Sequence, residues 1–141
     1  MSEENKAIYQ RYVDFLNTGD ESILSEVVAE DCVDHNPFPR QAPGRAGCLQ
    51  AGHMLRQALP DLKATVEDIV ASGDRVMGRW QIVGTNEGSL YGMPPTGKQI
   101  TVQGMDIVRI ADGKIVEEWT NRDNAGLMMQ IRPPIPQGAQ Q

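Results

Sequence analysis

Asp123 has the residue type and the position in the chain that a general base needs. It follows Trp119 and Asn121 at even spacing, so the three side chains would share one face of an extended strand. If that face borders a mostly apolar pocket, desolvation raises the pKa of the carboxyl group and suits it to take a proton from carbon. Asp123 also precedes a short helical pattern. As the N-cap of that helix it would accept backbone hydrogen bonds, which would lower its pKa.

His35 and Asn36 are candidates for contacts with a substrate oxygen. They belong to the run Asp34-His35-Asn36-Pro37, in an irregular segment rich in proline. The ordinary pKa of histidine lies near neutrality, so His35 could donate a proton or a hydrogen bond to a carbonyl oxygen. The structural alternative is a loop histidine that bonds only to backbone. We expect His35 to be the second catalytic residue.

Asp106 falls in phase with the apolar side chains of its strand. A carboxylate on an apolar face is costly unless it is paired or protonated, so Asp106 either lines the pocket or turns outward at a bulge near Gly104. Trp80, Trp119 and Tyr12 are further candidates for substrate binding. Flat aromatic rings suit an aromatic ligand, and a phenol can donate to an oxygen, although each of the three could also be core packing.

Bulk composition argues against several classes of function. The 141 residues carry a formal net charge of −6, which is unsuited to binding nucleic acid or an anionic membrane surface. Two cysteines and two histidines predict neither a disulfide framework nor a His-rich metal site. The opening residues MSEENK lack the pattern of a signal peptide, so the sequence predicts a cytoplasmic protein.

The first half of the chain has the periodicity of helices. Three helices are expected, from Ser2 to Gly19, from Asp20 to Val28, and from Gly44 to Leu59. A short extended piece could form at Cys32 to His35, between the second and third helices.

After Pro60 the period of the apolar residues changes to two. Strands are expected from Leu62 and from Arg75, and the second of these should turn Val76, Gly78, Trp80 and Ile82 inward. In the first, Leu62, Ala64, Val66, Asp68 and Val70 should share a face. A long hairpin then has Asp112-Gly113 at its tip, because type I′ turns need positive φ. A helix from about Asn124 to Ile131 follows.

Helices first and strands later predict an α+β fold in a single domain, residues 1–131. A curved antiparallel sheet would wrap around the N-terminal helices and enclose a pocket. The remaining residues, 132–141, are polar and rich in proline, so we expect a flexible tail.

Four stretches, in order and with compact spacing, carry a family resemblance. They are Asp34-His35-Asn36-Pro37, ALPDLKATVEDIVASGDRVMGRW from Ala58 to Trp80, GMPPTGK from Gly92 to Lys98, and GMDIVRIADGKIVEEWTNRD from Gly104 to Asp123. Through them the chain resembles the SnoaL-like polyketide and ester cyclases of the NTF2-like superfamily. The resemblance implies the NTF2-like cone.

The resemblance also implies an activity. The characterised cyclases of the family close a ring by intramolecular aldol condensation on a polyketide methyl ester, with no cofactor, metal or Schiff base. The position that matches their acidic residue, which takes the proton from carbon, is Asp123. An apolar, aromatic small-molecule substrate is therefore expected. The resemblance further implies a homo-oligomer, a dimer or tetramer, that buries the open face of the sheet.

Three other functions fit the same residues. A ketosteroid isomerase would also use an Asp base, with Tyr12 or Tyr91 and Asp106 as donors to the substrate oxygen. An epoxide hydrolase would use an Asp–Arg–Asp set with Asp106 and Arg79, although the strand phase turns Arg79 outward. A non-catalytic binding module would have an apolar pocket without convergent polar groups.

Overall fold

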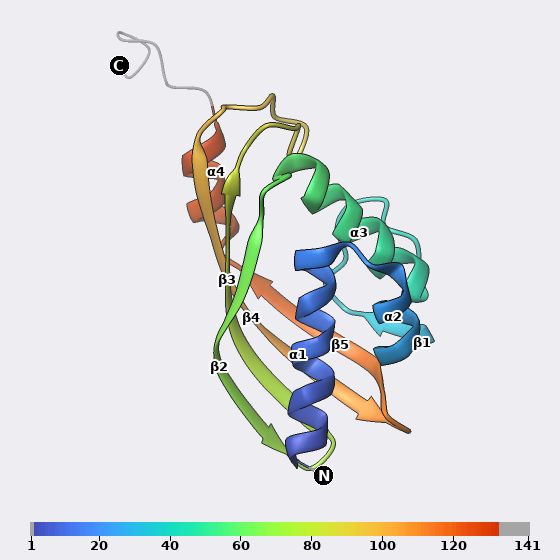
Figure 1. The fold of residues 1–141 in the computed structure, drawn as a ribbon. Helices are drawn as coiled ribbons and strands as arrows, with labels where there is room; N and C mark the ends of the chain where they lie inside the picture. Colours follow the sequence, from blue (N-terminus) through green and yellow to red (C-terminus); the bar gives the residue numbers. More distant parts are fainter. Residues whose placement is uncertain (1, 133–141) are drawn as a thin grey trace, which may run out of the picture.

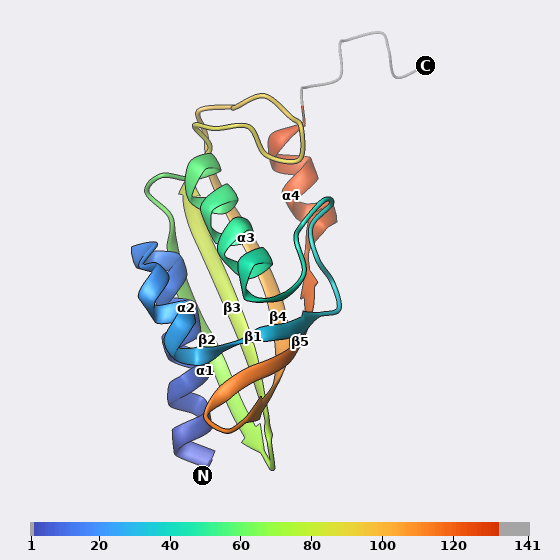
Figure 2. The same cartoon turned by 90° about the vertical axis from the view of Figure 1, so that its right-hand side faces the viewer.

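The computed structural model describes residues 2–132 and contains a curved sheet with helices on its concave side (Figure 1). These helices are α1 (Ser2–Thr18), α2 (Glu21–Val27) and α3 (Gly44–Ala58). Figure 2 shows them in front of the sheet, with α4 (Asn124–Ile131) apart from them. The expected α+β fold, with N-terminal helices against a curved sheet, is confirmed. The predicted tail lies outside the described residues, apart from Arg132.

The sheet has five strands in the order β1-β5-β4-β3-β2. Their bounds are Val28–Asp34 for β1, Lys63–Ser72 for β2, Arg75–Thr85 for β3, Gln99–Ala111 for β4 and Lys114–Arg122 for β5. The pairs from β2 to β5 are antiparallel, as expected, but β1 pairs parallel with β5. The sheet is therefore mixed rather than wholly antiparallel.

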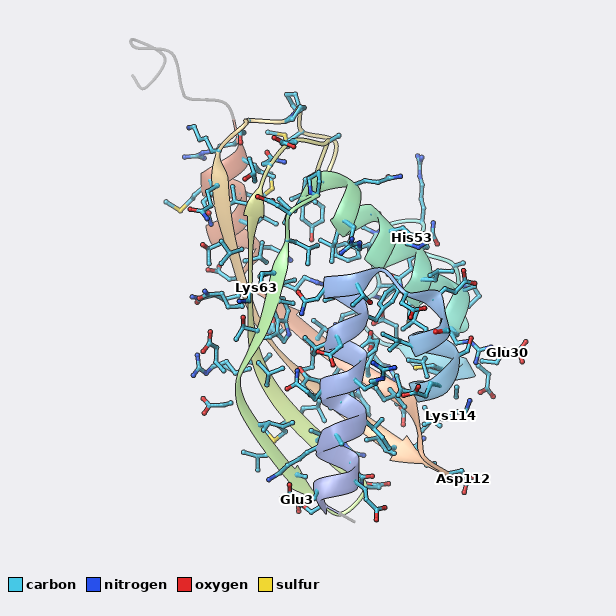
Figure 3. The ribbon with its side chains drawn as sticks, in the orientation of Figure 1. Glu3, Glu30, His53, Lys63, Asp112 and Lys114 are labelled. Atoms are coloured by element: carbon cyan, nitrogen blue, oxygen red, sulfur yellow. The ribbon has the colours of Figure 1, made fainter. Side chains whose placement is uncertain are left out.

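The hairpin of β4 and β5 has the predicted tip. Asp112 and Gly113 have φ angles of 52° and 75°, the two positive values of a type I′ turn. Figure 3 shows Asp112 at the end of this hairpin. The turn pairs Ala111 with Lys114, so it sets the initial register of β4 and β5.

A bulge in β2 changes which of its side chains face the helices. The register with β3 shifts between Val66 and Asp68, so Glu67 is an extra residue. Ala64 is buried before the bulge, as predicted, whereas Val70 after it is 59% exposed and Ile69 turns inward. The prediction that Asp68 and Val70 share the face of Ala64 is therefore wrong.

A second bulge, in β5, has a larger consequence for the site. The register with β4 shifts between Arg109 and Ile110, which leaves Val116 without an opposite residue. Beyond it, Asp106 pairs with Thr120, and Glu118 is buried while Trp119 is only partly so. One extra residue exchanges the two faces of a strand. Glu118, Thr120 and Arg122 thus point inward.

The end of β5 leads directly into α4. The backbone N–H of Asp123 still donates to the carbonyl of Gln103 at 2.8 Å, after which the chain turns into the helix. The side chain of Gln130 donates to and accepts from the backbone of Thr101, at 2.8 Å each, along the part of β4 that lies beyond β5. α4 therefore covers a strand edge instead of the concave face.

The core lies between the concave face and the helices. Large buried side chains from both layers meet there, including Tyr9 and Phe15 of α1 and Val76 and Val108 of the sheet. Within residues 2–132, none of the helices has the length and apolar character that a membrane span requires.

Candidate active site

A cavity of about 90 Å³ lies between α1, α3 and the concave face of β3, β4 and β5. Its walls are mostly apolar, from residues such as Phe15 and Ile82. A few polar side chains converge on it, which is the usual pattern of a small-molecule site. These include Tyr12, Asp34, Asp106, Glu118, Thr120 and Arg122.

Asp106 reaches the cavity from the centre of β4. Its carboxylate accepts a hydrogen bond from the hydroxyl of the fully buried Tyr9 at 2.9 Å. The opposite residue on β3 is Gly78, where a Cβ would clash with the Tyr9 ring. The glycine thus makes room for the tyrosine that holds the carboxylate.

The environment of Asp106 favours its neutral form more than water does. Burial raises the pKa of its carboxyl group above the ordinary value, although hydrogen bonds from Trp80, Thr120 and Tyr9 act in the opposite direction. A carboxylate with a raised pKa is a stronger base than an exposed one. Asp106 can therefore accept a proton inside the cavity.

Tyr12 and Glu118 form a second polar group in the same cavity. The Tyr12 hydroxyl donates to Oε2 of Glu118 at 2.6 Å, across from α1 to β5. Only 6% of Glu118 is exposed. Burial raises the pKa of Glu118 well above its ordinary value, and the nearby Cys48, Asp34 and Asp106 act in the same direction.

Arg122 contributes a positive charge to the cavity lining, and contacts with Phe38 and Asn36 fix the position of its guanidinium group. The group stacks over the ring of Phe38, 4.1 Å from the ring centre, and donates to the carbonyl of Asn36 at 3.4 Å. Arg122 lowers the pKa of Asp106 less than the side chains of Trp80, Thr120 and Tyr9 do.

Three of the residues expected from the sequence do line the cavity, namely Tyr12, Trp80 and Asp106. Trp80 packs where Gly104 of the neighbouring strand leaves space for its ring. Asn36 has a structural position instead: its Oδ1 accepts from the backbone N–H of Thr120 at 2.8 Å. That bond ties the irregular segment after β1 to β5.

Asp123 is not in the cavity, so the prediction that it faces the pocket is wrong. It is the N-cap of α4, and its Oδ1 accepts from the backbone N–H of Gly126 at 2.9 Å. The strand phase expected from a regular hairpin would have turned it inward with Asp106. The bulge at Val116 reverses that phase.

Trp119 and Asn121 lie on the other side of the sheet for the same reason, and His35 packs there against Trp119. The His35 ring stacks on that of Trp119, with centres 4.7 Å apart, and its Nε2 lies 2.8 Å from Glu117 Oε2. Arg109 donates to the other oxygen of Glu117 at 2.7 Å. The prediction that His35 and Trp119 line the cavity is therefore wrong.

Other candidates from the sequence also have partners elsewhere. Arg79 donates to Asp68 at 2.8 Å on the outer face, as its strand phase predicted. The hydroxyl of Tyr91 donates to Asn124 at 3.1 Å, away from the cavity.

Sequence reasoning missed Glu118. Its neighbour Glu117 has the same residue type, and alternation alone cannot say which of two consecutive glutamates points inward. The signal that could identify Glu118 is the apolar pattern of β4. Val108 is buried and pairs with Glu118, so both side chains lie on the same face of the sheet. Using that signal requires the bulge to be known.

Residues 6–131 match the SnoaL-like polyketide cyclase family. Over 136 residues the chain is 30% identical to the aklanonic acid methyl ester cyclase DauD of Streptomyces sp. (strain C5), and the match covers 92% of this chain and 82% of DauD.

Two solved structures extend the likeness to the fold. IdmH of Streptomyces antibioticus is 34% identical with a TM-score of 0.78, over 89% of this chain and 96% of IdmH. TsrD of Streptomyces laurentii has a TM-score of 0.85 at 26% identity, over 97% of this chain and 96% of TsrD. The family match spans nearly all of the described residues, so the chain belongs to the SnoaL-like polyketide cyclase family.

Proposed function

We propose that this protein closes a ring by an aldol-type reaction and needs no cofactor, with Asp106 as the general base. The observation that supports this most is a carboxylate with a raised pKa in a mostly apolar cavity, held by Tyr9. The similarity to an aklanonic acid methyl ester cyclase supports the reaction class. Asp106 takes the role that the sequence alone assigned to Asp123.

The proposed chemistry is an isomerisation in which atoms and charge balance. Asp106 removes a proton from a carbon next to a carbonyl group and becomes neutral, and the substrate becomes an enolate. The enolate carbon then attacks a second carbonyl carbon of the same molecule and forms the new C–C bond. The oxygen of that second carbonyl receives a proton, and Asp106 returns to its carboxylate form.

The size of the cavity restricts the substrate. About 90 Å³ is small beside the roughly 300–1,000 Å³ of sites that enclose drug-sized ligands. We therefore propose that only the reacting end of the substrate, about one ring with its keto-ester arm, is enclosed. A larger ring system would remain outside, beyond Phe38 and Arg122.

Exchange of the acidic C–H protons of a small aryl keto-ester for deuterium tests the base directly. The reaction is followed by NMR in D₂O at a pD where uncatalysed exchange is slow. Asp106→Asn, whose amide oxygen can still accept from Tyr9, should lower the catalysed rate by about 10²–10⁴.

Asp68→Asn is the matched control, because Asp68 is an exposed aspartate on the outer face. It should leave the exchange rate unchanged. Exchange by Asp106→Asn at the wild-type rate, in a protein with wild-type thermal stability, would exclude Asp106 as the base.

A further inference from the structure

We propose that Glu118 is a neutral carboxylic acid at pH 7 and that the hydrogen-bonded pair of Glu118 and Tyr12 donates one O–H to the substrate oxygen that becomes negative. This inference rests on the proposed function, since that oxygen belongs to the enolate formed when Asp106 removes the proton. It makes Glu118 and Tyr12 catalytic residues. The evidence is their geometry in the cavity and the charges around them.

The titratable groups that face Glu118 come from four elements around the cavity. They are Tyr12 from α1, Cys48 from α3, Asp34 from β1 and Asp106 from β4. Each of these described groups is neutral or anionic at pH 7. Arg122, on β5 itself, is held over Phe38. An ionised carboxylate in such surroundings would be buried without a paired cation, which is costly.

The adjacent glutamate shows the opposite environment. Glu117 faces outward and binds Arg109 at 2.7 Å and His35 at 2.8 Å. These hydrogen bonds, from His35 and Arg109, lower the pKa of Glu117. The two consecutive glutamates therefore differ: Glu117 is a carboxylate on the outer face of the sheet, and Glu118 is a neutral acid on the inner face.

As a neutral acid, Glu118 can donate a hydrogen bond. Tyr12 donates its proton to Oε2 of Glu118 at 2.6 Å, so the carboxyl O–H of Glu118 is left to donate into the cavity, where the two groups stand side by side. If the proton of Glu118 instead lies toward Tyr12, the phenol O–H becomes the donor. Either arrangement offers one O–H to a substrate oxygen.

Asp106 and Glu118 are placed to act on the two ends of one enolate. Asp106 pairs with Thr120 and Glu118 with Val108, so the two carboxyl groups are diagonal neighbours on adjacent strands. Such positions are separated by about 7–8 Å between Cα atoms, which leaves room for one carbon and its attached oxygen. A neutral donor there stabilises the developing charge, whereas a second carboxylate would repel it.

The protonation of Glu118 can be measured without any substrate. Protein labelled with ¹³C at the glutamate carboxyl carbons is titrated by NMR, and Glu118→Gln and Glu117→Gln assign the two signals. At pH 7 the Glu118 signal should be that of a protonated acid, and the Glu117 signal that of a carboxylate. A Glu118 signal in the ionised position at pH 7 would overturn the inference.

Binding of phenols, whose oxygen mimics that of an enolate, tests the donor role separately. Glu118→Leu and Tyr12→Phe should each weaken the binding of a small acidic phenol by at least about tenfold, measured by calorimetry. Glu118→Gln keeps an N–H donor and should stay within about threefold of wild type. The outward-facing Glu117→Gln should bind as wild type does.

The two proposals fail in different ways. Phenol binding by Glu118→Leu at wild-type strength overturns the donor role, whatever Asp106 does. Unchanged deuterium exchange by Asp106→Asn overturns the base assignment, while the NMR titration still reports on Glu118. A Glu118→Gln variant with weak phenol binding but wild-type thermal stability would also contradict the donor role.

Discussion

Glu117 and Glu118 have the same side chain and opposite electrostatic surroundings. Glu117 forms hydrogen bonds with Arg109 and His35, whereas Glu118 is buried in the cavity wall and accepts a hydrogen bond from Tyr12. Their chemical difference follows from burial and from which charges lie nearby, not from residue type. Tyr12, Trp80 and Asp106 could be named from the sequence because aromatic rings and an acid on an apolar strand face are visible there. Glu118 could not.

The pH dependence of stability should reveal the buried acid. The pKa of Glu118 is raised above its ordinary value of 4.5, so between these two values the folded state binds a proton that the unfolded state has lost. The stability from this group is full below pH 4.5 and declines as pH rises, by at most about 1.4 kcal/mol per pH unit.

Glu118→Gln removes this decline. The melting temperature of the variant, minus that of wild type, should therefore increase between about pH 5 and pH 8 in thermal unfolding experiments. Asp106 is present in both proteins, so most of its own contribution cancels in the difference. Parallel curves over this range would show that Glu118 ionises normally in the folded state.

Asp123 should behave as a helix cap. Asp123→Ala leaves the N–H of Gly126 without its acceptor and should lower the free energy of unfolding by about 1 kcal/mol. Asp123→Asn keeps a good cap and should be nearly neutral. Both variants should exchange substrate protons as wild type does. Loss of exchange in the Asn variant, with unchanged stability, would restore Asp123 as the base.

At the scale of elements, two bulges determine which side chains reach the cavity. The bulge in β2 turns Val70 outward, and the bulge in β5 turns Glu118, Thr120 and Arg122 inward. A strand pattern with period two predicts faces correctly only up to the first extra residue. The type I′ hairpin was predictable because its signal is a local dipeptide.

Gly78 in β3 should be intolerant of any side chain. Gly78→Ala places a Cβ against the ring of Tyr9, which is fully buried and bonded to Asp106. The variant should lose about 1–3 kcal/mol of stability in urea unfolding, and its exchange rate should fall because Asp106 loses its support. Met77→Ala, one residue away and exposed, should change stability by only about 0.5 kcal/mol. Equal effects of the two would argue against the Tyr9 contact.

At the scale of the whole molecule, the helices cover one face of the sheet and leave the other open. Val70, Met77 and Met105 are 59%, 53% and 61% exposed on that outer face, which also carries Trp119. A cluster of exposed apolar side chains of this kind is typical of an interaction surface. We therefore expect the homo-oligomer that the sequence led us to predict, with this face at the interface.

Light scattering coupled to size-exclusion chromatography tests that expectation. The wild-type protein should elute as a dimer or larger oligomer, and Met105→Lys should shift it toward the monomer, because a charge in the interface is costly. Met129→Lys is the control, since Met129 is 72% exposed on α4, away from this face. A monomeric wild-type protein would contradict the assembly.

The sequence by itself determined the features that depend on neighbours along the chain. Apolar periodicity located the helices, Asp112-Gly113 located the hairpin turn, and four motifs carried the family resemblance. These signals are local because capping, turn geometry and alternation act over a few residues.

Only the tertiary structure decided which carboxyl groups line the cavity. That outcome depends on one extra residue at Val116, on the pairing of β5 with β4, and on the burial of Glu118 beneath Tyr12. A bulge is stabilised by the strands on either side of it, and a pKa is set by all the charges and the solvent around a group. The spacing of residues along the chain reveals neither a bulge nor a pKa, so the position of Asp106 in the cavity and of Asp123 outside it became known only with the fold.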